Sequence, residues 1–137
     1  MIPRINFAHL PTPIESLPRL SEVLGGPKLF VKRDDQTGLA FGGNKTRKLE
    51  FLVAEAREQR TDMLISAGAL QSNHCRQTAA AAAKFGFECI LVLTGQAPRE
   101  ASANLLLDKL FGARIVTVAN RADRDRVLQE TFDEGGI

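Results

Sequence analysis

The sequence predicts an α/β fold in which helices flank an open parallel sheet. Short apolar runs at residues 63–68, 88–95 and 113–120 have the length and composition of buried strands. They alternate with helical segments of about 10 to 15 residues, which is typical of parallel βαβ units. Gly86 and Gly112 stand where two of these helical segments end, as glycine commonly does after a helix.

The first 35 residues predict one helix and one short strand. Residues 11–26 open with a proline turn and stop at two glycines, and their apolar positions have helical spacing: Ile14, Leu17, Leu20 and Leu24. The following KLFVKRDD, residues 28–35, predicts a short strand that ends in charged residues. The regular alternation of helix and strand starts only after this strand.

Asn44 is the expected N-cap of a helix that reaches about residue 59 and keeps its apolar positions mainly on one side. The chain then predicts a strand at 63–68, an alanine-rich helix at 73–85, a strand at 88–95, a helix at 99–111, a strand at 113–120 and a last helix from about Ala122. Residues 135–137 read as a helix stop followed by the start of another strand, so we expect the chain to be truncated at its C-terminus.

Length and composition favour one ordinary globular domain. The 137 residues include 18 Lys or Arg and 16 Asp or Glu, a net charge of +2, and the basic residues are spread along the chain. This argues against a nucleic-acid surface. No apolar run approaches the ~20 residues of a membrane span, and no signal core is visible, so we expect a cytoplasmic protein. Cys75 and Cys89 are expected to be free thiols.

The stretch GLAFGGNKTRKLE, residues 38–50, looks at first like a phosphate-binding loop that leads into a helix. In nucleotide-binding P-loops a lysine directly follows the second glycine. Here Asn44 occupies that place and Lys45 comes one residue later, which argues against a nucleotide hydrolase. Gly42 and Gly43 still lack the Cβ atoms that would keep another group away from the backbone.

Three cations lie in the first turn of the helix after this loop. Lys45 and Lys48 are three residues apart and share a face, and Arg47 adds a third charge nearby. Positive charge at a helix N-terminus opposes the macrodipole, so the arrangement favours a bound anion or one neutral amine. A neutral lysine condenses with aldehydes, which makes Lys45 a candidate Schiff-base lysine and leaves Lys48 to hold a phosphate. A solvated basic face is the alternative that these residues leave open.

A second loop, AGALQSN, also lies between a predicted strand and a predicted helix, where parallel sheets bind ligands. Ser72 and Asn73 offer a hydroxyl and an amide suited to a carboxylate or a phenolic oxygen. They serve equally well as a simple helix N-cap. His74 is either a general base or a packing residue, and Cys75 is expected to pack ahead of the alanine run.

The remaining polar groups favour structural roles over chemistry. Asp34 and Asp35 are adjacent, so their carboxylates are expected to point apart and to be structural. No metal site is expected, because the histidines and cysteines lack standard ligand spacing: His9, His74, Cys75 and Cys89.

Three stretches carry a family resemblance: KRDDQTGLAFGGNKTRKLEFL, SAGALQSNHCRQTAAAAAKFG and NLLLDKLFGA. They closely resemble the N-terminal part of the D-cysteine desulfhydrase and 1-aminocyclopropane-1-carboxylate deaminase family, pyridoxal-phosphate enzymes of the tryptophan-synthase-β type (fold type II). The resemblance implies that residues 1–47 belong to the larger cofactor-binding domain of such an enzyme. Residues 48–137 then form its smaller open-sheet α/β domain, cut short at the C-terminus.

The resemblance also implies a role for each loop. The lysine of the GGNK motif binds pyridoxal 5'-phosphate as a Schiff base, which matches Lys45, and the lysine three residues on approaches the phosphate, which matches Lys48. The asparagine of the QSN motif bonds the cofactor's ring oxygen, which matches Asn73. Ser72 is implied in catalysis. With Asn73, and less directly Gln71 and His74, it is implied in binding the substrate carboxylate or assisting proton transfer.

The implied activity is β-elimination from a small amino acid, with D-cysteine giving pyruvate, ammonia and sulfide. The QSNH motif, with His74, favours this activity over 1-aminocyclopropane-1-carboxylate deamination, and cysteate sulfo-lyase activity is a further alternative. Family members are much longer than this chain, so the resemblance implies a fragment of a homodimeric enzyme that is inactive alone. A non-catalytic module that binds a phosphorylated ligand is the alternative outside the family.

Overall fold

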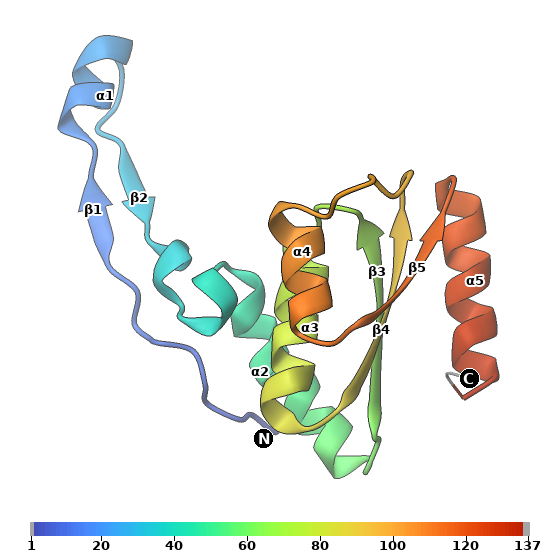
Figure 1. Cartoon of the computed structure of the whole chain (residues 1–137). Helices are drawn as coiled ribbons and strands as arrows, with labels where there is room; N and C mark the ends of the chain where they lie inside the picture. The colour runs from blue at the N-terminus through green and yellow to red at the C-terminus, as the bar shows by residue number, and fades with distance from the viewer. Residues whose placement is uncertain (1, 136–137) are drawn as a thin grey trace.

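The computed structural model describes residues 2–135 and shows an α/β fold with a parallel sheet between helices (Figure 1). Strands β3 (Met63–Ala69), β4 (Glu88–Thr94) and β5 (Arg114–Val118) lie side by side in the order β3-β4-β5. All pairs are parallel, with Ile65 opposite Ile90 and Leu91 opposite Ile115. The predicted fold class is therefore confirmed.

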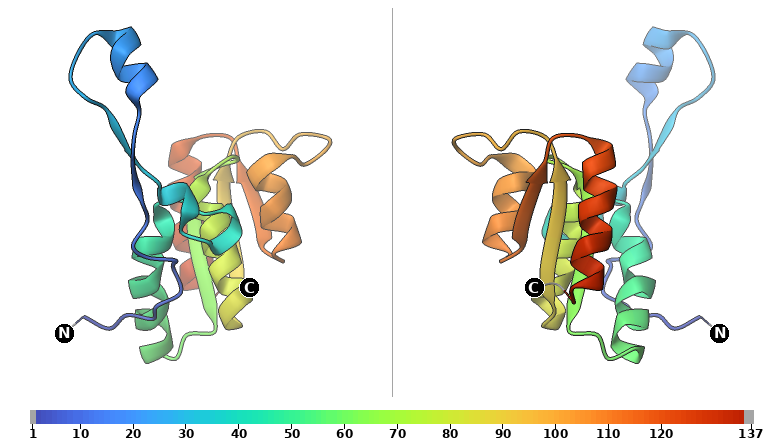
Figure 2. Two further views of the ribbon diagram at one scale, coloured as in Figure 1. Left: turned by 90° about the vertical axis from the view of Figure 1, so that its left-hand side faces the viewer. Right: turned by 90° about the vertical axis from the view of Figure 1, so that its right-hand side faces the viewer.

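Four helices cover the sheet. Helices α2 (Lys45–Glu58), α3 (Asn73–Phe85) and α4 (Ala103–Leu110) lie on one face, and α5 (Arg121–Asp133) lies on the other (Figures 1 and 2). Because α3 connects β3 to β4 and α4 connects β4 to β5, both helices begin at the edge of the sheet where the strands end. This edge is the usual ligand side of an open parallel sheet.

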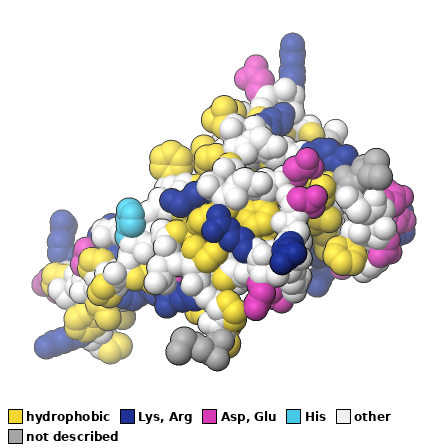
Figure 3. Space-filling model, turned by 90° about the horizontal axis from the view of Figure 1, so that it is seen from below, with side chains coloured by type: hydrophobic (Ala, Val, Ile, Leu, Met, Phe, Trp, Pro, Cys, Tyr) yellow, Lys and Arg dark blue, Asp and Glu magenta, His cyan; other side chains and the backbone are white. Residues whose placement is uncertain are grey.

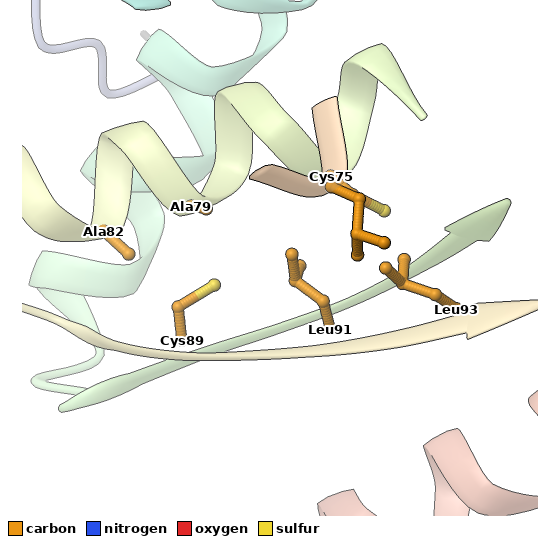
Figure 4. Close-up of a cluster of buried hydrophobic side chains, with 7 residues drawn as sticks. Cys75, Ala79, Ala82, Cys89, Leu91 and Leu93 are labelled. Carbon is orange, nitrogen blue, oxygen red and sulfur yellow. The ribbon is translucent and has the colours of Figure 1, made fainter. Parts of the chain in front are cut away.

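Helix α3 is fixed on the sheet by small side chains. Cys75, Ala79 and Ala82 face Cys89, Leu91 and Leu93 of the central strand β4 (Figure 4). Leu91 and Leu93 are completely buried, and burying each stabilises the fold by about 1.5–3 kcal/mol. The alanine run lets the helix approach the strand closely, so the N-terminus of α3 has a firmly held position.

Helix α2 packs on α3 through Leu49, Val53 and Ala81. Its completely buried Glu50 holds the N-terminal segment: Glu50 Oε1 accepts from the main-chain N–H groups of Phe7 and Ala8, each at 2.8 Å, and Oε2 lies 2.7 Å from Arg4 Nε. Burial opposes ionisation, but these donors keep the pKa of Glu50 below its ordinary value.

Residues 11–33, called the arm, differ from the sequence prediction. The helix expected over residues 11–26 is only α1 (Pro18–Leu24), and β1 (Ile14–Ser16) precedes it and pairs antiparallel with β2 (Phe30–Lys32). The helix prediction was wrong for residues 14–16 because their strand partner lies farther along the chain. Similarly, α4 begins at Ala103 instead of residue 99, while α5 begins at Arg121, close to the expected Ala122.

The arm stands away from the sheet (Figures 1 and 2) and exposes apolar side chains, among them Val23 at 81% and Leu24 at 64%. From below, hydrophobic side chains also gather near the middle of the molecule, with basic and acidic side chains spread around them (Figure 3). The predicted domain boundary at residues 47 and 48 falls inside α2 and stays a prediction.

The C-terminal prediction is only partly covered by the structure. Helix α5 ends at Asp133, and the strand start expected at residue 137 lies outside the described residues. Within residues 2–135, no helix combines the length and the apolar character that crossing a membrane requires.

Candidate functional site

The loop before α2, residues 38–44, is called the glycine loop. It has a backbone conformation that only glycine allows at residue 42. Gly42 has a φ of 72°, and a Cβ atom there would lie 1.8 Å from the carbonyl oxygen of Asp35. The N–H of Gly43 donates to the Asp34 carbonyl oxygen at 2.8 Å and to Thr37 Oγ1 at 2.9 Å. The loop is thereby folded back on the short 3-10 helix η1 (Asp34–Gln36), and α2 starts directly after it.

Buried polar side chains connect this loop to α3. Thr37, Thr46 and Gln77 are completely buried. Thr46 Oγ1 donates to Gln77 Oε1 at 2.7 Å, and Thr37 Oγ1 lies 3.2 Å from Thr46 Oγ1. An unsatisfied buried partner costs about 1–3 kcal/mol, so this chain of hydrogen bonds holds the start of α2 against α3.

The carbonyl oxygen of Gly42 also joins the glycine loop to α3. It accepts from Arg76 Nη2 at 2.8 Å and from Gln77 Nε2 at 3.2 Å. Gly43 must also lack a side chain, because a Cβ there would lie 2.3 Å from Gln77 Nε2. The glycine loop therefore fits against the first two turns of α3, and the side chains that start α2 lie next to those that start α3.

The two lysines of α2 help to lower the pKa of His74 in α3. Burial and the charges of Lys48 and Lys45 together lower the pKa of His74 to about 4. His74 is therefore neutral at physiological pH, and its Nδ1 is buried without a hydrogen-bond partner in the described part of the chain. Lys45 is half-buried and Lys48 is exposed. The structure thus brings Lys45, Lys48 and His74 together at one end of two helices.

Arg47 does not belong to this cationic group, which corrects the sequence interpretation. Its Nη2 lies 2.7 Å from Asp34 Oδ1 and 2.9 Å from Thr12 Oγ1, and its Nε lies 2.9 Å from Asp34 Oδ2. Hydrogen bonds from Arg47 and Thr12 lower the pKa of Asp34 to about 2. Arg47 therefore ties α2 to the arm, and two cations, not three, remain for an anion.

The two adjacent aspartates have the structural roles that the sequence favours. Asp34 pairs with Arg47, while Asp35 pairs with Arg33, whose Nη2 lies 2.6 Å from Asp35 Oδ2. Among residues 2–135, no group of three His, Cys, Asp or Glu side chains is arranged to hold a metal ion.

Ser72 is the N-cap of α3. Its Oγ accepts from the N–H of Cys75 at 3.2 Å, and its backbone is extended. A Cβ on Gly68 would lie 2.8 Å from Ser72 Oγ, so the glycine at the end of β3 makes room for this cap. The hydroxyl keeps its own proton to donate, so capping leaves Ser72 able to bind an anionic group beside the first N–H groups of α3.

Gln71 and Asn73 are held by α4 through a residue that the sequence interpretation did not single out. Asn104 donates from its main-chain N to Gln71 Oε1 at 2.9 Å, and from Nδ2 to Asn73 Oδ1 at 2.9 Å. The Gln71 side chain therefore serves as the cap that α4 lacks from its own Ser102. Two sequence signals for Asn104 were its place in the first turn of a predicted helix and its position at the start of the NLLLDKLFGA stretch.

The cysteines are packing residues. Both are free thiols, as predicted; Cys75 is completely buried and Cys89 is 7% exposed. Burial raises the pKa of Cys75 above its ordinary value and that of Cys89 to about 12. A cavity of about 580 Å³ lies along β3 between α2 and α5, with His74 on its wall, but Lys45, Lys48 and Asn73 do not line it.

These residues fit pyridoxal 5'-phosphate. The cofactor needs an amine for its aldehyde, positive charge and N–H donors for its phosphate, and a donor for its ring oxygen. The first turns of α2 and α3 present two amines, an asparagine amide and free main-chain N–H groups, next to a loop without side chains at Gly42 and Gly43. The carboxylates of Glu50 and Asp34 are engaged by other groups, and within residues 2–135 no ion pair joins Lys45 or Lys48 to a carboxylate.

Comparisons with known proteins agree with this chemistry. The family model for pyridoxal-phosphate dependent enzymes matches residues 5–136. The chain is 49% identical over 132 residues to a D-cysteine desulfhydrase of Salmonella typhimurium, covering 93% of this chain and 40% of that protein. The corresponding protein of Salmonella newport is 48% identical with the same coverage.

A solved structure is similar over the same region. The crystal structure of an ACC deaminase homologue superposes with a TM-score of 0.89 at 38% identity, covering 97% of this chain and 41% of that one. The chain spans about two fifths of the length of these relatives. The family and fold type that the sequence motifs implied are confirmed: the chain belongs to the family of pyridoxal-phosphate dependent enzymes.

Proposed function

We propose that Lys45 binds pyridoxal 5'-phosphate as a Schiff base in a lyase that converts D-cysteine and water to pyruvate, ammonia and hydrogen sulfide. One observation carries the proposal: the Gly42 carbonyl oxygen and the buried Thr46 and Gln77 side chains clamp the glycine loop to α3. This clamp puts both lysines beside the N-terminus of α3. The similarity to D-cysteine desulfhydrases supports the choice of substrate.

In this proposal the two helices hold different parts of the cofactor. Lys48 places its charge near the phosphate, and Asn73 donates an N–H to the ring oxygen. Bound pyridoxal phosphate supplies the electron sink for negative charge at the substrate's Cα. Lys45 is half-buried at the start of α2 and forms no ion pair with a carboxylate within residues 2–135.

The same residues supply the proton transfers and the substrate contacts. The Lys45 amine, when free, would take the Cα proton as general base. The Ser72 hydroxyl and the free N–H groups of α3 bind the substrate carboxylate. His74 stays neutral and offers a nitrogen as acceptor or donor on the side of the lysines. Gln71 contributes by fixing the loop, because its side chain is bonded to α4.

A second candidate function is opening of the ring of 1-aminocyclopropane-1-carboxylate to an α-keto acid and ammonia. The structural similarity to an ACC deaminase homologue favours it. The residues that bind the cofactor are the same in both proposals, so only substrate turnover distinguishes them. Cysteate, which would release sulfite, is the third substrate to compare.

We also propose that the full-length protein is a cytoplasmic homodimer. The exposed apolar side chains of the arm support an additional contact in the complete protein, because exposed apolar patches commonly mark interaction sites. Sedimentation at several concentrations tests the dimer.

The experiment compares three proteins, each made as the longest chain that the source encodes and saturated with pyridoxal phosphate: the wild type, Lys45→Ala and Lys84→Ala. Lys84 is exposed in the last turn of α3, at the opposite end from the site. We expect D-cysteine turnover to fall by about a hundredfold or more in Lys45→Ala, and to stay unchanged in Lys84→Ala.

The other outcomes are equally informative. Faster turnover of 1-aminocyclopropane-1-carboxylate or cysteate than of D-cysteine would replace the proposed substrate. If Lys45→Ala keeps wild-type turnover, Lys45 does not bind the cofactor. If the cofactor binds but none of the three substrates turns over, the protein is a non-catalytic phospholigand-binding module.

A further inference from the structure

We propose that Asn104 is a positioning residue that fixes the amide of Asn73 with its NH₂ group free for the cofactor. The inference rests on the proposed function, in which Asn73 donates to the cofactor's ring oxygen. The two residues are 31 positions apart and start different helices, α3 and α4, yet their side chains are 2.9 Å apart.

Four hydrogen bonds join the start of α4 to Gln71, in the loop before α3, and to Asn73, the first residue of α3. Asn104 Nδ2 donates to the Gln71 carbonyl oxygen at 2.7 Å and to Asn73 Oδ1 at 2.9 Å. The Asn104 main-chain N donates to Gln71 Oε1 at 2.9 Å, and Gln71 Nε2 donates to the Ser102 carbonyl oxygen at 3.3 Å. The last two bonds hold Gln71 and Asn104 at a fixed separation, so the Asn104 amide has little freedom to move.

The chemistry of the partners decides which way each amide is turned. A main-chain carbonyl oxygen only accepts hydrogen bonds, so the Asn104 atom next to the Gln71 carbonyl must be Nδ2. That nitrogen only donates, so the Asn73 atom next to it must be Oδ1. The Gln71 carbonyl therefore fixes the orientation of the Asn104 amide, and the Asn104 amide in turn fixes that of Asn73.

The result is a free donor at the site. With Oδ1 engaged by Asn104, Asn73 Nδ2 has no acceptor within residues 2–135. Turning the Asn73 amide over would set two NH₂ groups against each other and lose one hydrogen bond, which disfavours that orientation by about tenfold. Asn104 thus keeps Asn73 ready to donate before any ligand binds.

A fixed donor on the ring oxygen changes the cofactor in a measurable way. An N–H that donates to the negatively charged oxygen weakens its attraction for the proton on the Schiff-base nitrogen, which lowers the pKa of that nitrogen. If Asn73 presented its oxygen instead, repulsion would raise that pKa. The orientation of Asn73 is therefore read from the pH at which the lysine-bound cofactor changes its absorption spectrum.

The test uses the full-length protein as wild type, Asn104→Asp, Asn104→Ala and Ser102→Ala. The introduced carboxylate of Asn104→Asp keeps the shape of asparagine but only accepts hydrogen bonds, so Asn73 must turn its NH₂ toward it. Asn104→Ala leaves Asn73 free to turn. Ser102→Ala is the matched control, because the Ser102 side chain makes no capping hydrogen bond at the same helix end.

Two quantities are measured for each protein: the spectroscopic pKa of the lysine-bound cofactor and the dissociation constant of pyridoxal phosphate. The urea midpoint of the cofactor-free protein monitors any general loss of structure. We expect Asn104→Asp to raise the spectroscopic pKa by roughly one unit and to weaken cofactor binding about tenfold. Asn104→Ala should give a smaller change, and Ser102→Ala none.

If Asn104 had a purely structural role, Asn104→Ala would shift the spectroscopic pKa at least as much as Asn104→Asp, because it removes both side-chain hydrogen bonds without inverting the Asn73 amide. If Asn104→Ala shifts the spectroscopic pKa as much as Asn104→Asp, or if neither shifts it, the inference is wrong while the proposed function stands. If the wild type forms no lysine-bound cofactor at all, the inference and the proposed function both fail.

Discussion

The pKa of His74, a residue of the candidate site, depends on neighbours that are distant in sequence. Lys45 and Lys48 of α2 lie close enough to His74 of α3 to lower its pKa, together with burial, to about 4. The clamp of Thr46 on Gln77 produces this proximity. His74 is therefore expected to act in its neutral form, and a substrate anion near the lysines would raise its pKa again.

The shifted pKa of His74 predicts a pH-dependent stability. The ordinary pKa is 6.5 and the folded value is about 4, so between these pH values the unfolded chain binds a proton that the folded chain does not. Stability is therefore fully present above about pH 6.5 and falls as the pH falls toward 4. We expect the wild type to lose more of its free energy of unfolding between pH 7 and pH 5 than His74→Gln does.

Urea unfolding at the two pH values measures this difference. Other titrating groups contribute equally to both proteins, so the comparison isolates His74. An identical loss of stability in both proteins would show that His74 titrates normally in the folded state.

At this scale the sequence singles out residues that lie within motifs, and not residues defined by their partners. Lys45, Lys48, Ser72 and Asn73 stand out because two short motifs contain them, and their roles stay predictions. Arg47 was grouped with the lysines because it shares their helical turn, but Asp34, 13 positions earlier, draws its guanidinium away. Asn104 was missed because its partners lie in another loop.

Among the elements, the glycine loop sets the position of α2. Gly42 has a positive φ and carries its carbonyl oxygen to Arg76 and Gln77. Gly112, at the end of α4, also has a positive φ, of 82°, but a Cβ there would meet nothing within 4 Å. Gly42 therefore combines a backbone conformation restricted to glycine with a close contact, whereas Gly112 has a positive φ without such a contact.

We expect Gly42→Ala to destabilise the protein more than Gly112→Ala. At Gly112 the positive φ alone makes alanine cost about 1–2 kcal/mol. At Gly42 a φ of 72° with a ψ of −176° is a combination that is essentially restricted to glycine, so the backbone cost there is about 1–3 kcal/mol. Gly42→Ala also forces a Cβ against the Asp35 carbonyl group, which adds at least about 1–3 kcal/mol. Free energies of unfolding in urea give both values, and equal losses for the two variants would mean that the loop does not pack as described.

Elements with local sequence signals were predicted well, and those that depend on pairing were not. The three parallel strands are continuous apolar runs, and α3 ends at Gly86 as expected. Residues 14–16 were read as helix because Ile14 and Leu17 have helical spacing, whereas their pairing with residues 30–32 decides the structure. The start of α4 moved to Ala103 because the cap that it uses comes from Gln71.

At the scale of the whole molecule, the packing of α3 on β4 predicts the behaviour of both thiols. Cys75 and Cys89 lie in the same apolar layer (Figure 4), and burial raises the pKa of each. We expect a thiol reagent at pH 8 to leave both unmodified in the folded protein and to modify both in urea. A thiol that reacts before unfolding would show that this layer opens in the native state.

The overall architecture follows from the alternation of strands and helices, but the site does not. Alternation predicts that the starts of α3 and α4 share one edge of the sheet, without stating which side chains meet there. The position of α2 beside α3 depends on buried polar contacts among Thr37, Thr46 and Gln77, which no pattern of apolar residues indicates. The family motifs name candidate site residues, which periodicity does not, and the roles of those residues stay predictions.

Borohydride reduction after incubation with pyridoxal phosphate, followed by peptide mapping, tests the central claim most directly. It is applied to this chain and to the longest chain that its source encodes. We predict a pyridoxyl group on Lys45 in the longer chain, with little labelling of exposed lysines such as Lys84. Labelling scattered over surface lysines, or none on Lys45, would contradict the assignment of Lys45 as the cofactor-binding residue.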